Sequence, residues 1–330
     1  MKKLTRAFHR FLICAFCLLP CAFLNSCSRG DNPPVKFLSV ATGGTGGVYY
    51  PYGGALARLI SEKLPGYQAT AEVTGGSIDN LKYLQLGKVD IAFTLADTLD
   101  EAVKGSGPFQ GSAVGSIRTL AVLYTNYTHV VVRKGSGVKR ISDLRGRVVS
   151  VGAPGSGTEL IADRVLAAAG IDSRKDLTRH QLSVVESAAA MKDNKLDAFF
   201  WSGGAPSSAI QDLAATPGMS IAIVPQDDLL VRLQRDFSRR LYRLAVVPPG
   251  VYRGIDEGAP TVGVENLLVA ASSLDSDVVY AIVKLLYDEK PALVAAHPEA
   301  RHLELSASPD VSPAPFHPGA IRYYKEHGWR

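Results

Sequence analysis

The segment Phe37-Leu-Ser-Val-Ala-Thr-Gly-Gly-Thr-Gly-Gly47 places a short apolar run directly before a glycine-rich turn. A second segment, Val148-Val-Ser-Val-Gly-Ala-Pro-Gly-Ser-Gly-Thr158, repeats the same order. Apolar runs of this length between turn signals are typical of buried strands, and the patterns after both turns are typical of helices. The chain therefore contains one strand–turn–helix plan twice, which predicts two α/β lobes that face each other across a cleft.

The beginning of the chain has the composition of an export signal. Four cations within residues 2–10 precede the apolar run 11–23, which is too short to span a membrane and long enough for a secretory signal. The run leads into Leu24-Asn25-Ser26-Cys27, which resembles a bacterial lipobox although Asn25 departs from the usual residue. We expect a signal peptide over residues 1–27, a lipid anchor on Cys27 and a tether over residues 28–34. The protein is then a periplasmic, membrane-anchored lipoprotein.

Most of the net positive charge and all of the cysteine residues belong to this leader. The chain has 36 Lys and Arg against 31 Asp and Glu, and removing the four leader cations leaves 32 against 31. A near-neutral chain gives no electrostatic reason to expect nucleic acid as a partner. The 46% hydrophobic and 20% charged residues are those of a folded protein. All four cysteines lie in the leader (Cys14, Cys17, Cys21 and Cys27), so the mature chain can form neither a disulfide nor a thiolate site.

Two long β-rich stretches divide the remaining chain. Arg118–Lys134 is predicted to cross from the first lobe to the second, and Thr261–Ala270 to cross back. Lobe 1 would then comprise residues 35–129 and 261–330, and lobe 2 residues 130–260. Strands and helices alternate within each lobe, which is typical of a parallel sheet with right-handed crossovers. In lobe 2 the pattern predicts a strand near Gln181–Val184 and a helix over Ala188–Asp193.

Three glycine-bearing turns lie between a strand and a helix: Thr45-Gly46-Gly47, Thr74–Ser77 and Ser156-Gly157-Thr158. Ligands of open α/β sheets bind at the carboxyl ends of strands, and the first amides of a helix have no internal partner. We expect these amides to cradle an anion, with the hydroxyls of Ser77, Ser156 and Thr158 as orienting groups. One such turn is more often only a tight connection, but three in equivalent positions favour a site. A ligand that bridges them would favour closure of the lobes.

Aromatic and acidic residues follow these strands and turns. Tyr49 comes directly after the first turn, and Trp201 and Pro206 follow the third strand of lobe 2. Each can either line the cleft or pack in the core. Asp97 lies just beyond the predicted strand Val89–Thr94. It can hold a ligand ammonium group or cap the helix predicted at Thr98–Val103.

Motifs for other kinds of site are missing from the sequence. The first turn lacks the third glycine of a dinucleotide fingerprint, and no turn continues as a Walker A sequence. The seven histidines show no metal-ligand spacing, so we expect neither a metal nor a cofactor. A nucleophilic Ser156 would need a base, and the sequence places none beside it. We expect a binding protein rather than an enzyme, with a periplasmic enzyme that uses Ser156 as the weaker alternative.

Six stretches match the pattern of one receptor family in order along the chain. They are Ala41-Thr-Gly-Gly-Thr-Gly-Gly-Val-Tyr-Tyr-Pro-Tyr-Gly, Thr74-Gly-Gly-Ser-Ile-Asp-Asn-Leu, Gly87-Lys-Val-Asp-Ile-Ala-Phe, Gly152-Ala-Pro-Gly-Ser-Gly-Thr, Asp197-Ala-Phe-Phe and His317-Pro-Gly-Ala-Ile-Arg-Tyr-Tyr. In these stretches the chain resembles the TAXI family of extracytoplasmic solute receptors, which serve tripartite ATP-independent periplasmic (TRAP) transporters.

This resemblance implies a type II periplasmic-binding-protein fold, with two α/β lobes, a two-strand hinge and a ligand cleft between them. It also implies a small organic anion as ligand, similar to glutamate, glutamine or 2-oxoglutarate, which the receptor presents to a TRAP permease. The site residues carried over are Gly46, Gly47, Tyr49, Ser77, Asn80, Asp97 and the turn Ser156-Gly157-Thr158.

The chain departs from the family at Leu95-Ala96-Asp97, where Gln-Ser-Asp is common. Either the ligand is less polar on that side, or Leu95 and Ala96 face the core. A receptor of the same fold that serves an ABC importer or a sensor is the nearest alternative function. A purely structural lipoprotein is a further one.

Overall fold

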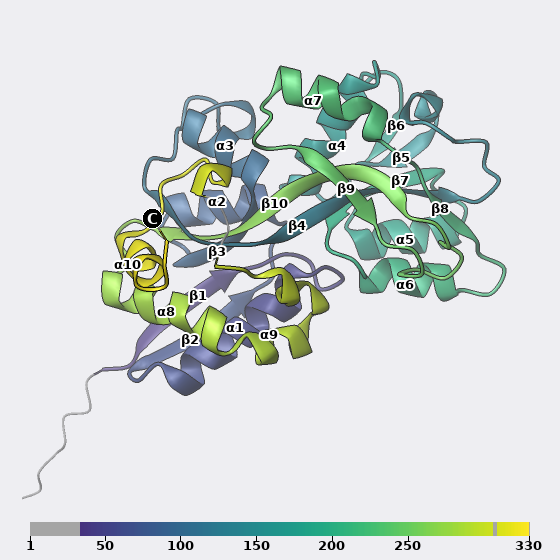
Figure 1. The fold of residues 1–330 in the computed structure, drawn as a ribbon. Coiled ribbons are helices and arrows are strands. Elements are labelled where there is room, and N and C mark those ends of the chain that lie inside the picture. The colour runs from purple at the N-terminus through teal and green to yellow at the C-terminus, as the bar shows by residue number, and fades with distance from the viewer. Residues whose placement is uncertain (1–33, 306–308, 330) are drawn as a thin grey trace, which may run out of the picture. The chain divides into compact units, whose positions relative to one another are not determined.

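The computed structural model describes residues 34–305 and 309–329 (Figure 1). The predicted signal peptide, Cys27 and residues 28–33 of the tether lie outside the described residues, so their assignments stay predictions. From Val35 onward the chain forms one compact unit.

The described residues form ten strands and ten α-helices. The strands are β1 (Lys36–Ala41), β2 (Tyr67–Glu72), β3 (Ile91–Leu95), β4 (Ile117–Arg133), β5 (Val148–Ser150), β6 (Thr178–His180), β7 (Ala198–Gly203), β8 (Ile221–Ile223), β9 (Arg243–Val247) and β10 (Ala259–Ala271). The helices are α1 (Tyr49–Lys63), α2 (Ser77–Gln85), α3 (Ala96–Lys104), α4 (Gly157–Ala168), α5 (Val184–Lys192), α6 (Ser208–Ala215), α7 (Leu230–Asp236), α8 (Ser276–Asp288), α9 (Lys290–Ala296) and α10 (Pro318–Glu326). In this part of the chain no helix is both long and apolar enough to cross a bilayer.

All ten strands belong to one mixed sheet in the order β2-β1-β3-β10-β4-β7-β5-β6, with β8 paired to β4 and β9 to β10. The outer strands on each side pair in parallel, whereas β3, β10, β4 and β7 pair antiparallel. Helices cover both faces of the sheet (Figure 1). We call β1–β3, α1–α3 and α8–α10 lobe 1, and β5–β8 and α4–α7 lobe 2.

The two longest strands connect the lobes. Strands β4 and β10 lie side by side in the middle of the sheet and run through both lobes (Figure 1). Almost every residue of β10 is buried, as expected for a strand that is covered on both faces. These strands coincide with the two β-rich stretches of the sequence. The predicted lobe boundaries near residues 130 and 261 fall inside them and stay a prediction.

One strand of lobe 2 lies earlier in the chain than its sequence pattern predicts. Strand β6 ends at His180, and the residues predicted as strand lead into helix α5 instead. Ser183 starts this helix with a capping box, in which Ser183 Oγ accepts from the Glu186 amide and the Glu186 carboxylate accepts from the Ser183 amide. The predicted strand Gln181–Val184 was wrong because the capping box formed by Ser183 and Glu186 starts a helix at Val184.

Candidate functional site

A small cavity lies between the two lobes. Its volume is about 50 Å³. By the same measure one water molecule needs roughly 10–15 Å³, so any occupant must be a small molecule. Three glycine-bearing segments form much of its wall, and the strands β3, β4 and β7 contribute the rest. The residues that line it are Gly43, Gly44, Gly47, Val48, Tyr49, Gly75, Gly76, Ser77, Leu95, Tyr124, Asn126, Ser156, Gly157, Thr158, Trp201, Ser202 and Gly203.

The predicted site residues fall into two groups. Those in the cavity wall are Gly47, Tyr49, Ser77, Ser156, Gly157, Thr158 and Trp201. Those outside it are Thr45, Gly46, Asn80, Asp97 and Pro206. The fold therefore brings together residues from all three glycine-bearing turns, as the sequence predicts, but leaves part of the predicted set elsewhere.

Trp201 occupies a position that only glycine neighbours permit. A Cβ atom added at Gly47 would lie 2.7 Å from Trp201 Cη2, and one added at Gly203 would lie 2.4 Å from Trp201 Nε1. The ring thus packs against the first glycine turn of lobe 1 from its own place in lobe 2. Of the two roles weighed for Trp201, lining the cavity is the one that this position supports.

Gly46 contacts the other lobe rather than the cavity. Its carbonyl oxygen accepts from Ser207 Oγ at 3.1 Å and from Ser208 Oγ at 3.4 Å, and both serines belong to lobe 2. A Cβ atom at Gly46 would lie 2.6 Å from a Val185 methyl group. Glycine at this position lets the lobes approach each other closely.

The N-terminus of α2 is already bonded to a carbonyl group of the opposite lobe. The amides of Ile78 and Asp79 both donate to the Gly155 carbonyl oxygen at 3.1 Å. These amides were expected to cradle a ligand anion, and in this closed arrangement they are not available to one. The reason is that the Gly155 carbonyl brings partial negative charge to the same helix N-terminus.

The N-terminus of α4 differs because its first two residues line the cavity. Ser156 is the N-cap, and its Oγ accepts from the Glu159 amide at 3.1 Å and donates to the Ala153 carbonyl at 2.6 Å. Its hydroxyl hydrogen is therefore committed to a carbonyl group rather than to a base, which gives no support to the nucleophile alternative. Gly157 and Thr158 follow in the first turn, where helix amides have no internal partner.

Asn80 holds the first glycine turn in place from inside the protein. It is fully buried, and its Nδ2 donates to the carbonyl groups of Thr42 at 2.7 Å and Phe93 at 2.8 Å. Its Oδ1 accepts from Thr74 Oγ1 at 2.6 Å. These bonds use both polar atoms of the side chain, so Asn80 positions the wall of the cavity instead of facing into it.

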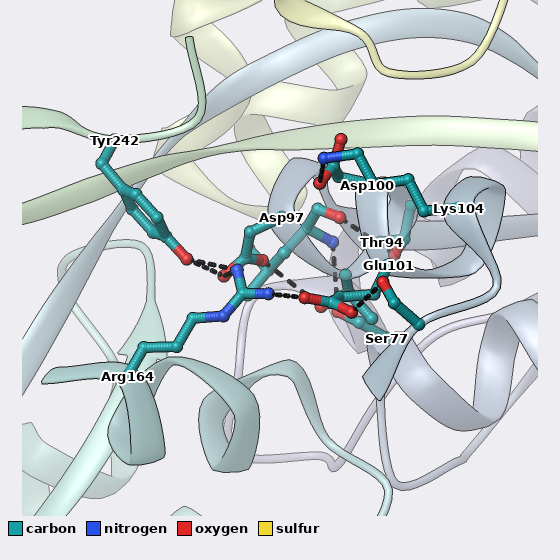
Figure 2. A network of polar contacts seen from close by, with 11 residues as sticks. Ser77, Thr94, Asp97, Asp100, Glu101, Lys104, Arg164 and Tyr242 are labelled. Atoms are coloured by element: carbon teal, nitrogen blue, oxygen red, sulfur yellow. Dashed lines mark hydrogen bonds and ion pairs between the residues drawn. The ribbon is translucent and has the colours of Figure 1, made fainter. Parts of the chain in front are cut away.

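Asp97 belongs to a buried network that joins the two lobes (Figure 2). It accepts from Tyr242 Oη at 3.0 Å, and Arg164 approaches from α4 with 3.6 Å between Nη1 and Oδ2. Burial raises the pKa of Asp97, and the guanidinium group of Arg164 opposes that shift. Neither predicted role holds for Asp97. It lies outside the cavity wall, and it lies inside the first turn of α3, which begins at Ala96, rather than before that helix.

Several cavity residues were not predicted from the sequence. Tyr124 and Asn126 come from β4, and Ser202 comes from β7. A hydrogen-bonded chain connects Asn126 and Ser202 to lobe 1: Tyr49 Oη donates to Asn266 Oδ1, Asn266 Nδ2 donates to Asn126 Oδ1, and Asn126 Nδ2 donates to Ser202 Oγ. The one sequence signal for these residues was Asn126, an asparagine inside a β-rich stretch. Asparagine is unfavourable in a strand unless its amide group has partners.

Leu95 and Ala96, at which the sequence departs from the TAXI pattern, have different environments. Leu95 lines the cavity. A Cβ atom added at Gly157 would lie only 2.6 Å from Leu95 Cδ1. Ala96 is buried at the start of α3 and is not part of the wall. One side of the cavity is thus apolar at Leu95.

The cavity wall contains polar groups but no charged side chain. None of the described residues that line it is a Lys, Arg, His, Asp or Glu. Burial raises the pKa of both Tyr49 and Tyr124 above the ordinary range, so both hydroxyls stay neutral. Elsewhere in the described residues, no group of three or more His, Asp or Glu side chains is placed to hold a metal ion.

Comparison with known proteins places the chain in a family. A model of the NMT1-like family matches residues 40–328. A solved structure from Bordetella bronchiseptica RB50 has a TM-score of 0.52 at 16% identity, covering 88% of this chain and 98% of that chain. A periplasmic transporter has a TM-score of 0.50 at 14% identity, covering 89% and 93%. The substrate-binding protein of an amino acid ABC transporter has a TM-score of 0.46 at 15% identity, covering 78% and 97%.

Because the sequence identities are this low, the similarity to the first two structures shows only that the fold is shared. Together with the sheet order, they confirm the predicted fold class, an α/β periplasmic-binding-protein fold with two lobes joined by two long strands.

Proposed function

Because the chain belongs to the NMT1-like family, we propose that it is a solute receptor that closes its two lobes around a small organic anion and delivers it to a membrane importer. The observation that carries the proposal is the cavity wall, to which both lobes and the connecting strand β4 contribute. A site divided between lobes couples ligand binding to closure, because the full set of contacts exists only when the lobes meet.

The anion has two kinds of donor available to it. The first turn of α4 presents helix amides and the positive end of a helix dipole. Hydroxyl groups of the wall, such as that of Thr158, add further donors. This combination agrees with the carboxylate-bearing ligand expected from the sequence.

For the importer that this receptor serves, we propose the alternative considered in the sequence analysis, an ABC importer in place of a TRAP permease. None of the structures reported above is described as a TRAP receptor, and one is described as part of an ABC transporter. We therefore take an ABC importer as the first partner and a TRAP permease as the second. Uptake by membrane vesicles that contain the cognate permease distinguishes them. It should depend on ATP with an ABC importer, and on an ion gradient without ATP with a TRAP permease.

A periplasmic location and a lipid anchor on Cys27 complete the proposal. Metabolic labelling with a radioactive fatty acid tests the anchor, and Cys27→Ala should abolish the label. The label should persist in Cys21→Ala, the matched control in the same leader.

The receptor proposal itself is tested by mass spectrometry of small molecules released from freshly purified protein. We expect one small anion in excess over the same preparation of Gly157→Val, whose lobes cannot close. Identical profiles from the two proteins would count against a ligand in this cavity. Turnover of the released compound by the wild type, and its loss in Ser156→Ala, would favour the enzyme alternative instead.

A further inference from the structure

Hydroxyl groups of the cavity wall accept hydrogen bonds from N–H groups of the protein, but their own hydrogens have no acceptor among these bonds. Thr158 Oγ1 accepts from the Ser202 amide at 3.1 Å, and Ser202 Oγ accepts from Asn126 Nδ2 at 3.2 Å. A hydroxyl group that already accepts from an N–H group keeps its own hydrogen to donate. The protein thus occupies the accepting side of these oxygens and leaves their donating side.

Two further donors of the wall have no partner within the described residues. Tyr124 Oη and Trp201 Nε1 are both buried and make no hydrogen bond there. The Tyr124 side chain is only 3% exposed, and the indole N–H group can act only as a donor. Buried donors without a partner are rare and costly. Both residues belong to the cavity wall, so an acceptor on a ligand held there would satisfy them.

An ammonium group would find poor partners in this cavity. No carboxylate belongs to its wall, and Asp97, the carboxylate considered for that role, is bonded to Tyr242 and faces Arg164. A buried cation without an anionic or accepting partner is strongly unfavourable.

We propose that the ligand is a small anion rich in hydrogen-bond acceptors that carries no ammonium group, such as a keto acid, a hydroxy acid or an alkanesulfonate. Tyr124 and Trp201 donate to the acceptors of this anion, and the lack of a carboxylate in the wall excludes the ammonium group. This inference rests on the proposed receptor function and narrows its ligand class. It retains the 2-oxoglutarate-like ligand expected from the sequence and excludes glutamate and glutamine.

Matched pairs of ligands test the exclusion of ammonium groups by calorimetric titration of the purified protein. The pairs are 2-oxoglutarate with glutamate, succinate with aspartate, and ethanesulfonate with 2-aminoethanesulfonate. In each pair that binds, the member without the ammonium group should bind at least about a hundred-fold more tightly, given the cost of an unpaired buried charge. Equal or tighter binding of the amino member would overturn the inference and leave the receptor proposal intact. No binding by any member would overturn both.

Two tyrosine variants test the role of Tyr124 with a matched control. Tyr124→Phe should weaken binding of the preferred ligand about ten-fold, because one hydrogen bond to a charged group is lost. The melting temperature of the unliganded variant should not fall, because the hydroxyl has no protein partner. Tyr52→Phe removes another buried hydroxyl without a partner, but Tyr52 packs against Phe93 outside the cavity wall.

Tyr52→Phe should therefore bind like the wild type. If Tyr124→Phe also binds like the wild type, Tyr124 does not contact the ligand and the inference fails. Trp201→Phe, which removes the indole donor but keeps a ring, should weaken binding in the same direction.

Discussion

Arg164 of helix α4 and Asp97 of helix α3 form a buried ion pair between the two lobes, with 3.6 Å between Nη1 and Oδ2 (Figure 2). The same guanidinium group binds Glu101 and lies over the Phe237 ring, 4.1 Å from its centroid. It also donates to Tyr242 Oη at 2.5 Å. Because Asp97 and Glu101 belong to lobe 1 and Arg164 to lobe 2, opening the lobes would separate opposite charges.

Replacing the cation of this network should destabilise the fold. Arg164→Met leaves Asp97 buried without a cationic partner, so we expect the free energy of unfolding in urea to fall by about 3–5 kcal/mol at neutral pH. The loss should shrink toward acidic pH, because the raised pKa of Asp97 rises further without Arg164 and protonation then removes the unpaired charge. Arg58→Met is the control, because it breaks the half-exposed pair with Glu62 and should cost less than about 1 kcal/mol. Similar small losses in both variants would show that the pair between the lobes contributes little.

Gly157→Val should impair binding far more than stability. The added Cβ atom would lie 2.6 Å from Leu95 Cδ1 and 2.7 Å from Ser77 Oγ, both in lobe 1, so the lobes cannot approach fully. Small-angle scattering should show a larger radius of gyration with ligand present than in the wild type. The melting temperature should fall no further than in Arg164→Met, because at most the contacts between the lobes are lost. Gly54→Val is the control, since nothing lies within 4 Å of a Cβ atom added there. Equal losses of binding and of stability in Gly157→Val would mean that this glycine serves only the local turn.

Ser156→Ala should behave as the loss of a helix cap. Ser156 Oγ accepts from the Glu159 amide, as Ser183 Oγ accepts from the Glu186 amide in α5. Each substitution should therefore lower the free energy of unfolding by about 1 kcal/mol, measured by urea denaturation. Ligand affinity should change little in Ser156→Ala. A much larger effect on ligand than in Ser183→Ala would give Ser156 a direct role in the site.

Glu299 should make stability depend on pH. This residue of the short 3-10 helix Pro298–His302 is only 2% exposed, and its Oε1 accepts from the Ala205 amide at 2.7 Å. Its Oε2 makes no hydrogen bond within the described residues, and His302 Nε2 lies 3.7 Å away. Burial raises the pKa of Glu299 from 4.5 to about 7.

The folded protein therefore holds this proton more tightly than the unfolded chain does. The stability that the neutral carboxyl group provides is complete below about pH 4.5 and is lost as the pH rises to about 7. Glu299→Gln removes the charge, so it should be more stable than the wild type above pH 7, by on the order of 3 kcal/mol, and similar to it near pH 4.5. Glu62→Gln on the surface is the control. A difference between Glu299→Gln and wild type that does not vary with pH would contradict the raised pKa of this buried carboxyl group.

The sequence alone predicts the two-lobed α/β arrangement because both strand–turn–helix units have strong local signals. Apolar runs identify the strands, and the glycines that follow them, such as Gly47 and Gly157, identify the turns at the ligand side. The two crossing strands were recognisable as unusually long β-rich stretches. These features depend on local pattern and on topology, which a single sequence contains.

The composition of the cavity wall could be predicted only in part, because it depends on how the lobes meet. Asp97 follows a strand at the correct end of the sheet, but Arg164 from a distant helix draws it into a network away from the cavity. The amides at the start of α2 have the chemistry of an anion site, but Gly155 of the other lobe occupies them. Tyr124 enters the cavity from a strand whose pattern shows only that it is buried.

A thermal-shift titration of the purified protein tests the central claim most directly. The panel comprises C4–C5 dicarboxylates, acidic and amide amino acids, and short alkanesulfonates, each added to wild type and to Gly157→Val. We predict that at least one anion raises the melting temperature of the wild type in a saturable manner, with little or no rise in Gly157→Val. A flat response of the wild type to the whole panel, or the same rise in both proteins, would contradict a ligand held between the two lobes.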